Sequence, residues 1–124
     1  MKGFKVLVVD DEPFICRSLS FVLRRESYEV FEARDGEEAM ALIRAERPDL
    51  IFLDVMMPKK NGFDVTREVK SDPDLSSIKI ILLTAKGQDS DRATGKQAGA
   101  DEYMTKPFSP TKLLERARFL LRGD

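Results

Sequence analysis

Near its start the chain reads Phe4-Lys5-Val6-Leu7-Val8-Val9-Asp10-Asp11-Glu12-Pro13. The apolar part, Phe4–Val9, does not alternate with polar residues, which is typical of a strand buried on both faces of a parallel sheet. Comparable apolar runs predict further strands at Tyr28–Phe31, Leu50–Leu53 and Ile78–Leu83, and a weaker one at Glu102–Met104. The sequence therefore predicts five strands, most of them fully buried.

The segments between these strands carry apolar residues at helical spacing. Asp35 and Glu38 can form a capping box at one helix start, with Asp35 as N-cap, and Ser109-Pro110 places an N-cap before a proline at another. The helix expected within Gln88–Gln97 is the weakest, because its apolar face is thin and Gly95 lies inside it. Strands and helices thus alternate as (βα)₅. This pattern predicts one α/β domain over residues 1–124, a parallel sheet with helices on both faces.

Composition narrows the possible functions. The chain has 124 residues, of which 21 are basic and 22 acidic, so no overall charge favours direct binding to nucleic acid or to an anionic membrane. It contains no histidine, which excludes histidine metal sites, Ser-His-Asp triads and a role as histidine phosphodonor. A single cysteine, Cys16, cannot form an internal disulfide, and no signal peptide or membrane span is apparent. We therefore expect a cytoplasmic protein.

Polar side chains follow four of the predicted strands. Asp10 and Asp11 end the first strand, Asp54 the third, Thr84 the fourth and Lys106 the fifth. In an open parallel sheet, ligands bind outside the carboxyl ends of the strands. We therefore expect three carboxylates, one hydroxyl and one ammonium group to gather at a single edge of the sheet.

Clustered carboxylates repel one another unless a cation binds between them. With oxygen donors alone, Mg²⁺ is the expected ion, and a carboxylate beside it can act as a nucleophile that forms an aspartyl phosphate. Lys106 and Thr84 could then stabilise the phosphoryl group. Singly, each residue has a simpler explanation. For Asp11, before Glu12-Pro13, a helix N-cap is as good an interpretation as a metal ligand.

These residues give the chain a resemblance to the receiver domains of two-component response regulators, which extends over nearly its whole length. The resemblance rests on four motifs, which together are highly specific: Val9-Asp10-Asp11-Glu12, Leu53-Asp54-Val55-Met56-Met57-Pro58, Leu83-Thr84-Ala85 and Lys106-Pro107-Phe108. It implies a doubly wound, flavodoxin-like fold with strand order 2-1-3-4-5.

The resemblance also implies a role for each site residue. Asp54 would accept a phosphoryl group from a histidine kinase or a histidine phosphotransfer protein. Asp10, Asp11, Asp54 and the backbone carbonyl of Met56 would bind Mg²⁺. Thr84 and Lys106 would contact the phosphoryl group, Tyr103 would move inward when Thr84 moves, and Lys106-Pro107 would be a cis peptide. A downstream protein would bind the fourth helix, fifth strand and fifth helix, roughly Gln88 to Leu121, with the chain a monomer or a phosphorylation-dependent dimer.

Some positions depart from the common pattern of the family. Lys60-Asn61-Gly62 stands where many relatives have an apolar residue followed by Asp-Gly, so Lys60 adds charge beside the expected site. Met56 and Lys86 occupy variable positions two residues beyond Asp54 and Thr84. Neither side chain offers a carboxylate or amide to orient an attacking water, which favours a phosphoryl group that is not especially short-lived.

Two other classes of function fit parts of the sequence. A magnesium-dependent phosphohydrolase with an aspartate nucleophile usually has a second acid two residues further on, where this chain has Met56. A receiver-like module that binds partners without being phosphorylated is the other alternative. We expect a switch that is not an enzyme, since it transfers phosphate only to and from its own aspartate. No output domain follows in this chain, so it is either a single-domain regulator or a piece of a longer one.

Overall fold

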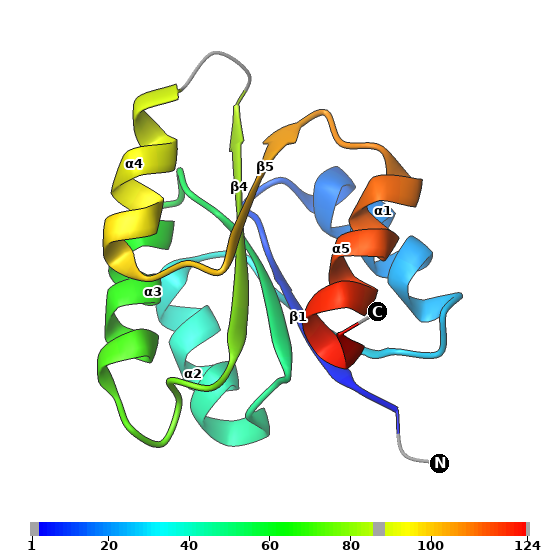
Figure 1. Cartoon of the computed structure of the whole chain (residues 1–124), viewed down its shortest axis with the longest axis horizontal. Coiled ribbons are helices and arrows are strands. Elements are labelled where there is room, and N and C mark those ends of the chain that lie inside the picture. Colours follow the sequence, from blue (N-terminus) through cyan, green and yellow to red (C-terminus); the bar gives the residue numbers. More distant parts are fainter. Residues whose placement is uncertain (1–2, 86–88, 124) are drawn as a thin grey trace.

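Five strands and five helices alternate along the part of the chain that the structure describes (Figure 1). The structure is a computed structural model, and it describes residues 3–85 and 89–123, with side chains for all of these except residues 89–91. The strands are β1 (Lys5–Val9), β2 (Glu29–Ala33), β3 (Leu50–Asp54), β4 (Lys79–Ala85) and β5 (Glu102–Lys106). The helices are α1 (Pro13–Arg24), α2 (Gly36–Glu46), α3 (Gly62–Ser71), α4 (Asp89–Ala98) and α5 (Pro110–Arg122).

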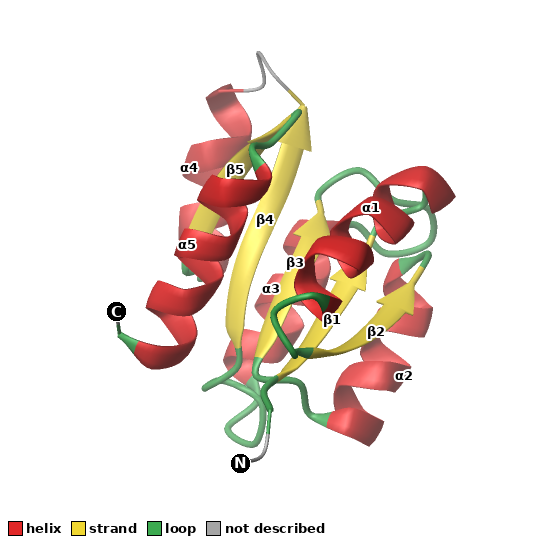
Figure 2. Ribbon diagram, turned by 90° about the vertical axis from the view of Figure 1, so that its right-hand side faces the viewer, coloured by secondary structure: helices red, strands yellow, loops and turns green. Residues whose placement is uncertain are grey.

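The five strands form one parallel sheet of order β2-β1-β3-β4-β5, as predicted (Figure 2). Strand bounds differ from the prediction mainly at the carboxyl ends. β4 continues through Thr84 and Ala85, which pair with Thr105 and Lys106 of β5. Backbone pairing needs no apolar side chain, so Asp54, Thr84 and Lys106 lie inside their strands rather than after them.

The helices cover both faces of the sheet, α1 and α5 on one and α2, α3 and α4 on the other (Figures 1 and 2). Successive residues of β1 belong to opposite faces: Val6 and Val8 pack in the core beneath α1 and α5, whereas Leu7 and Val9 pack in the core beneath α2 and α3. All four are fully buried. Burial on both faces explains the absence of alternation in this strand.

The predicted caps are present, with one difference. The Asp35 side chain accepts a hydrogen bond from the Glu38 amide over 2.8 Å, but the Glu38 side chain accepts from the amide of Arg34 rather than from that of Asp35. The Ser109 side chain accepts from the Lys112 amide and begins α5. Within residues 3–85 and 89–123, no helix combines the length and apolar character that crossing a bilayer requires.

Candidate functional site

The polar strand ends meet at the carboxyl edge of the sheet, as the sequence predicts. Asp10 follows β1, Asp54 is the last residue of β3, Thr84 lies near the end of β4, and Lys106 ends β5. Asp10 is completely buried, and Asp54 and Thr84 are exposed by only 5% and 2%. Ionisable groups are rarely buried unless a partner compensates their charge.

Lys106 supplies that compensation. Its ammonium nitrogen lies 2.8 Å from Oδ2 of Asp10 and 3.4 Å from Oδ1 of Asp54. Burial lowers the pKa of Lys106, but the hydrogen bond to Asp10 and the charges of both aspartates outweigh it, so the net pKa is raised. Lys106 is therefore a fixed positive charge between the two buried carboxylates.

Asp54 remains electrostatically strained despite this partner. Burial and the neighbouring charge of Asp10 raise its pKa to about 6, although Lys106 and a hydrogen bond from the Met56 backbone act in the opposite direction. A carboxylate in this state gains from any further cation that binds beside it. Near pH 7 it is mostly ionised and can act as a nucleophile.

Asp11 completes a group of three carboxylates. One oxygen each from Asp10, Asp11 and Asp54 can be chosen so that all three lie within 4.8 Å of one another. Asp11 is the exposed member, and it does not cap α1, whose N-cap residue is Glu12 without a side-chain capping bond. The capping interpretation is therefore wrong for Asp11. Three oxygen donors and an exposed side fit Mg²⁺, which retains several waters.

The backbone of the loop after β3 packs closely against the end of that strand, next to the site. The amide of Val55 donates to the Leu83 carbonyl, and the amide of Gly62 donates to the Val55 carbonyl. A Cβ on Gly62 would lie 2.5 Å from the Asp54 carbonyl oxygen, so only glycine fits here.

Next to Asp54 is an open cleft of about 450 Å³ with seven lining residues: Glu12, Ile15, Asp54, Met56, Ala85, Lys106 and Pro107. The Lys106-Pro107 peptide is cis, as the resemblance implied.

Tyr103 lies on β5 and packs at the edge of the core beneath α2 and α3. The guanidinium of Arg92, on α4, lies 4.8 Å from the centre of the Tyr103 ring. This cation–π contact could not be predicted from the sequence, because it joins two elements through long side chains.

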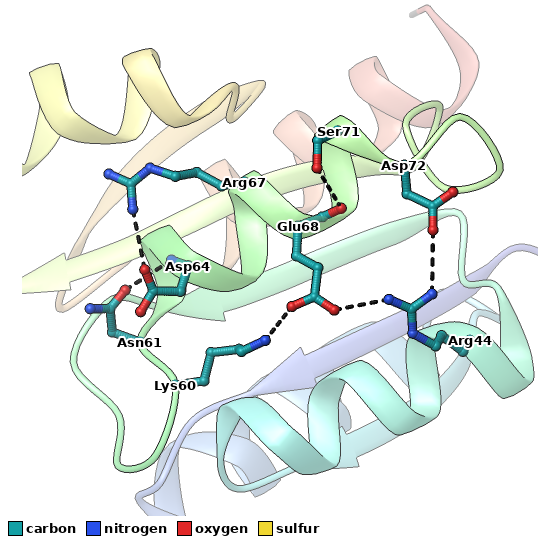
Figure 3. A network of polar contacts seen from close by, with 8 residues as sticks. All are labelled: Arg44, Lys60, Asn61, Asp64, Arg67, Glu68, Ser71 and Asp72. Atoms are coloured by element: carbon teal, nitrogen blue, oxygen red, sulfur yellow. Dashed lines mark hydrogen bonds and ion pairs between the residues drawn. The ribbon is translucent and has the colours of Figure 1, made fainter.

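Lys60 was expected to add charge beside the site. In the structure its ammonium forms an ion pair with Glu68 of α3, which also binds Arg44 of α2 (Figure 3). Sequence spacing offered no signal for this pairing. Lys86 and Gln88, which entered the expectations on phosphoryl lifetime and output surface, lie outside the described residues.

Known proteins provide an independent comparison. The sequence matches the response regulator receiver domain over residues 6–118. It is 51% identical over 118 residues to the probable transcriptional regulator ycf27 of Cyanophora paradoxa, an alignment that covers 95% of this chain and 48% of that protein. The chain spans about half the length of the curated relatives it matches.

Solved structures agree in fold. The chemotaxis response regulator CheY4 of Vibrio cholerae has a TM-score of 0.90 and 35% identity, covering 97% of this chain and all of that one. The receiver domain of the sensor histidine kinase PA1611 from Pseudomonas aeruginosa, with magnesium coordinated in its active site cleft, has a TM-score of 0.89 and 30% identity over 99% of this chain and all of that one. The chain therefore belongs to the family of response regulator receiver domains.

Proposed function

We propose that this chain is a phosphoryl-accepting switch in which Asp54 receives a phosphoryl group at a magnesium site. The observation that carries the proposal is the position of Asp54, a nearly buried carboxylate with a raised pKa, 3.4 Å from Lys106 and in one cluster with Asp10 and Asp11. The donor is a histidine kinase or a histidine phosphotransfer protein, the partners with which receiver domains interact. Mg²⁺ is bound by the three aspartates and by the backbone carbonyl of Met56.

The transfer is a displacement at phosphorus. A carboxylate oxygen of Asp54 forms a bond to the phosphorus of a phosphohistidine on the donor, and the bond between phosphorus and the imidazole nitrogen breaks. The electron pair of that bond remains on the nitrogen, which takes up a proton from solvent. Mg²⁺, when bound, supplies neutralisation of charge on the phosphoryl oxygens. Lys106 contributes a second positive charge that its raised pKa keeps protonated.

The bound phosphoryl group then biases the conformation of the domain. It adds about −1.5 to −2 charges and strong hydrogen-bond acceptors beside Lys106 and Thr84. Movement of the Thr84 side chain towards it leaves space that Tyr103 can fill, which changes the surface formed by α4, β5 and α5. A downstream protein reads this surface, so the phosphoryl group acts by shifting populations.

The direct test is incubation with acetyl phosphate and Mg²⁺, followed by intact mass spectrometry. We expect the mass of one phosphoryl group on the wild type, lost on treatment with base and absent from Asp54→Asn. Asp64→Asn is the matched control, since Asp64 is an exposed carboxylate that pairs with Arg67 of its own helix and should still label. EDTA should prevent labelling of all variants.

The same experiment separates the switch from its alternatives. A phosphohydrolase would consume many equivalents of a generic phosphate ester per protein, whereas the switch labels once and loses the group slowly. A folded, magnesium-bound wild type that forms no adduct would overturn the proposal and leave a binding module without phosphorylation.

A further inference from the structure

The loop that joins β3 to α3, residues 55–61, is held by side chains from two helices. The ammonium of Lys60, in this loop, donates to Oε1 of Glu68 on α3 (Figure 3). Arg44 on α2 donates to the other carboxylate oxygen of Glu68 over 2.9 Å, and to Asp72 over 3.3 Å. Glu68 therefore binds one cation from the loop and one from α2 at the same time. We call Lys60, Glu68 and Arg44 the loop clamp.

The backbone of the same loop is also confined. A Cβ on Gly36, the first residue of α2, would lie 2.5 Å from Cβ of Lys60 and closer still to its carbonyl oxygen, so α2 lies directly against the loop. Lys59 has a φ of 70°, and the Lys60 amide donates to the Pro58 carbonyl over 2.8 Å in a tight turn. The Lys59 ammonium lies 3.6 Å from Asp35 at the start of α2. Lys60 thus joins a tight turn to two helices.

We infer that the loop clamp positions the loop for Mg²⁺ binding, with Lys60 and Glu68 as positioning residues that touch neither metal nor phosphoryl group. The inference rests on the proposed function, in which the carbonyl of Met56 is a ligand from this loop. Mg²⁺ requires near-ideal octahedral geometry at about 2.1 Å, so a carbonyl on a loop that moves binds it less well than one on a loop that is held. Partners of metal ligands in general affect metal affinity in this way.

The substitution Lys60→Met tests the inference, because two physical effects predict opposite results. If Lys60 acted only as a nearby positive charge, removing it would strengthen the binding of a divalent cation. If it acts through the loop clamp, removing it frees the loop and weakens binding. Arg67→Met is the matched control, because Arg67 carries the same single positive charge but lies on α3 and pairs with Asp64 on its own helix.

We expect titration calorimetry with MgCl₂ to give a dissociation constant about two- to fivefold higher for Lys60→Met and for Glu68→Gln, the range that a partly exposed ion pair allows. Arg67→Met should leave the constant unchanged or slightly lower. The double variant Lys60→Met/Glu68→Gln should have a dissociation constant for Mg²⁺ no higher than that of the weaker-binding single variant, because both changes remove the same contact. In 1 M salt, where screening acts over about 3 Å, the difference between wild type and Lys60→Met should shrink.

Amide hydrogen exchange without metal gives a second measurement, independent of Mg²⁺. The amides of Lys60 and Gly62, which donate to Pro58 and Val55, should exchange faster in Glu68→Gln than in wild type. Equal or tighter Mg²⁺ binding by Lys60→Met, or unchanged exchange in Glu68→Gln, would overturn the inference while wild type still binds Mg²⁺ and labels on Asp54. Failure of wild type to bind Mg²⁺ would instead contradict the proposed function.

Discussion

The ammonium of Lys106 donates a hydrogen bond to Oδ2 of Asp10 over 2.8 Å, although 96 positions separate the two residues in sequence. Their strands are not neighbours, since β3 and β4 lie between β1 and β5 in the sheet. The contact therefore depends on the whole sheet being assembled, and it gives the buried Asp10 its positive partner.

Removing this partner should destabilise the metal-free protein. In Lys106→Met, Asp10 and Asp54 remain buried and lose the ammonium that pairs with both, so we expect the free energy of unfolding to fall by about 3 kcal/mol. Urea denaturation in EDTA measures the change, and added MgCl₂ should recover part of it. Lys112→Met, an exposed position on α5, is the control and should change stability little. Equal stability of Lys106→Met and wild type would show that the contact contributes nothing.

The raised pKa of Asp54 predicts a pH dependence of stability. Its pKa is about 6 in the folded protein against an ordinary aspartate value of 3.8, so between these values the folded state holds more protons than the unfolded state. Stability therefore falls as the pH rises from about 4 to about 6, by about 3 kcal/mol in all, and the loss persists above pH 6.

Comparison of wild type with Asp54→Asn isolates this contribution. Asp35 and Glu68 have lowered pKa values and act in the opposite direction, but they are present in both proteins. We expect Asp54→Asn in EDTA to be more stable than wild type at pH 7, with a difference that shrinks as the pH falls and vanishes below about pH 3. Urea denaturation across this range is the measurement, and a difference that does not vary with pH would contradict the assignment.

Mg²⁺ should stabilise the folded protein, because the three carboxylates come together only in that state. At a hundredfold excess over its dissociation constant, the ion adds about 2.7 kcal/mol to the free energy of unfolding. Asp11→Asn should lose most of this gain but retain the metal-free stability, because Asp11 is exposed and caps no helix. NaCl at equal ionic strength is the control, and an equal gain in NaCl would show screening rather than binding.

The sequence predicted this site well because its chemistry lies at strand ends, which a parallel sheet brings to one edge. Asp10, Asp54, Thr84 and Lys106 could be placed without knowing any side-chain rotamer. The contact between Lys60 and Glu68 could not, because it depends on the path of a loop and on two long side chains that could each reach several partners. Asp11 lay between these cases: its place at the strand end was predictable, but only the observed N-cap at Glu12 ruled out the capping interpretation.

Close backbone packing makes Gly62 sensitive to substitution. A Cβ there would lie 2.5 Å from the Asp54 carbonyl oxygen and 2.9 Å from the Cα of Val55, both backbone atoms that cannot move alone. We expect Gly62→Ala to cost about 2 kcal/mol of stability and to slow labelling of Asp54. Gly95→Ala is the control: its Cβ would lie 2.7 Å from the end of the Leu82 side chain, which can move, and 3.7 Å from the Phe63 ring, and alanine favours the helix by about 1 kcal/mol. Equal losses from the two variants would contradict this explanation.

The contact between Arg92 and Tyr103 should oppose the switch. The guanidinium lies 4.8 Å from the ring centre, a geometry worth about 0.5–1 kcal/mol at an exposed site, and it favours the present position of Tyr103. If phosphorylation draws Tyr103 inward, the contact must break. Arg92→Gln should therefore raise the population of the inward ring by about two- to fivefold, both before and after phosphorylation.

Ring resonances of the two tyrosines measure this effect in one NMR experiment. Tyr28, the other tyrosine, is buried beside Phe4 and serves as the internal control, so its shifts should stay constant. We expect the Tyr103 resonances of unphosphorylated Arg92→Gln to move part of the way towards those of the phosphorylated wild type. Lys96→Gln removes a neighbouring charge on α4 and should have no such effect. Movement in another direction, or equal movement in both variants, would show that Arg92 does not hold the ring.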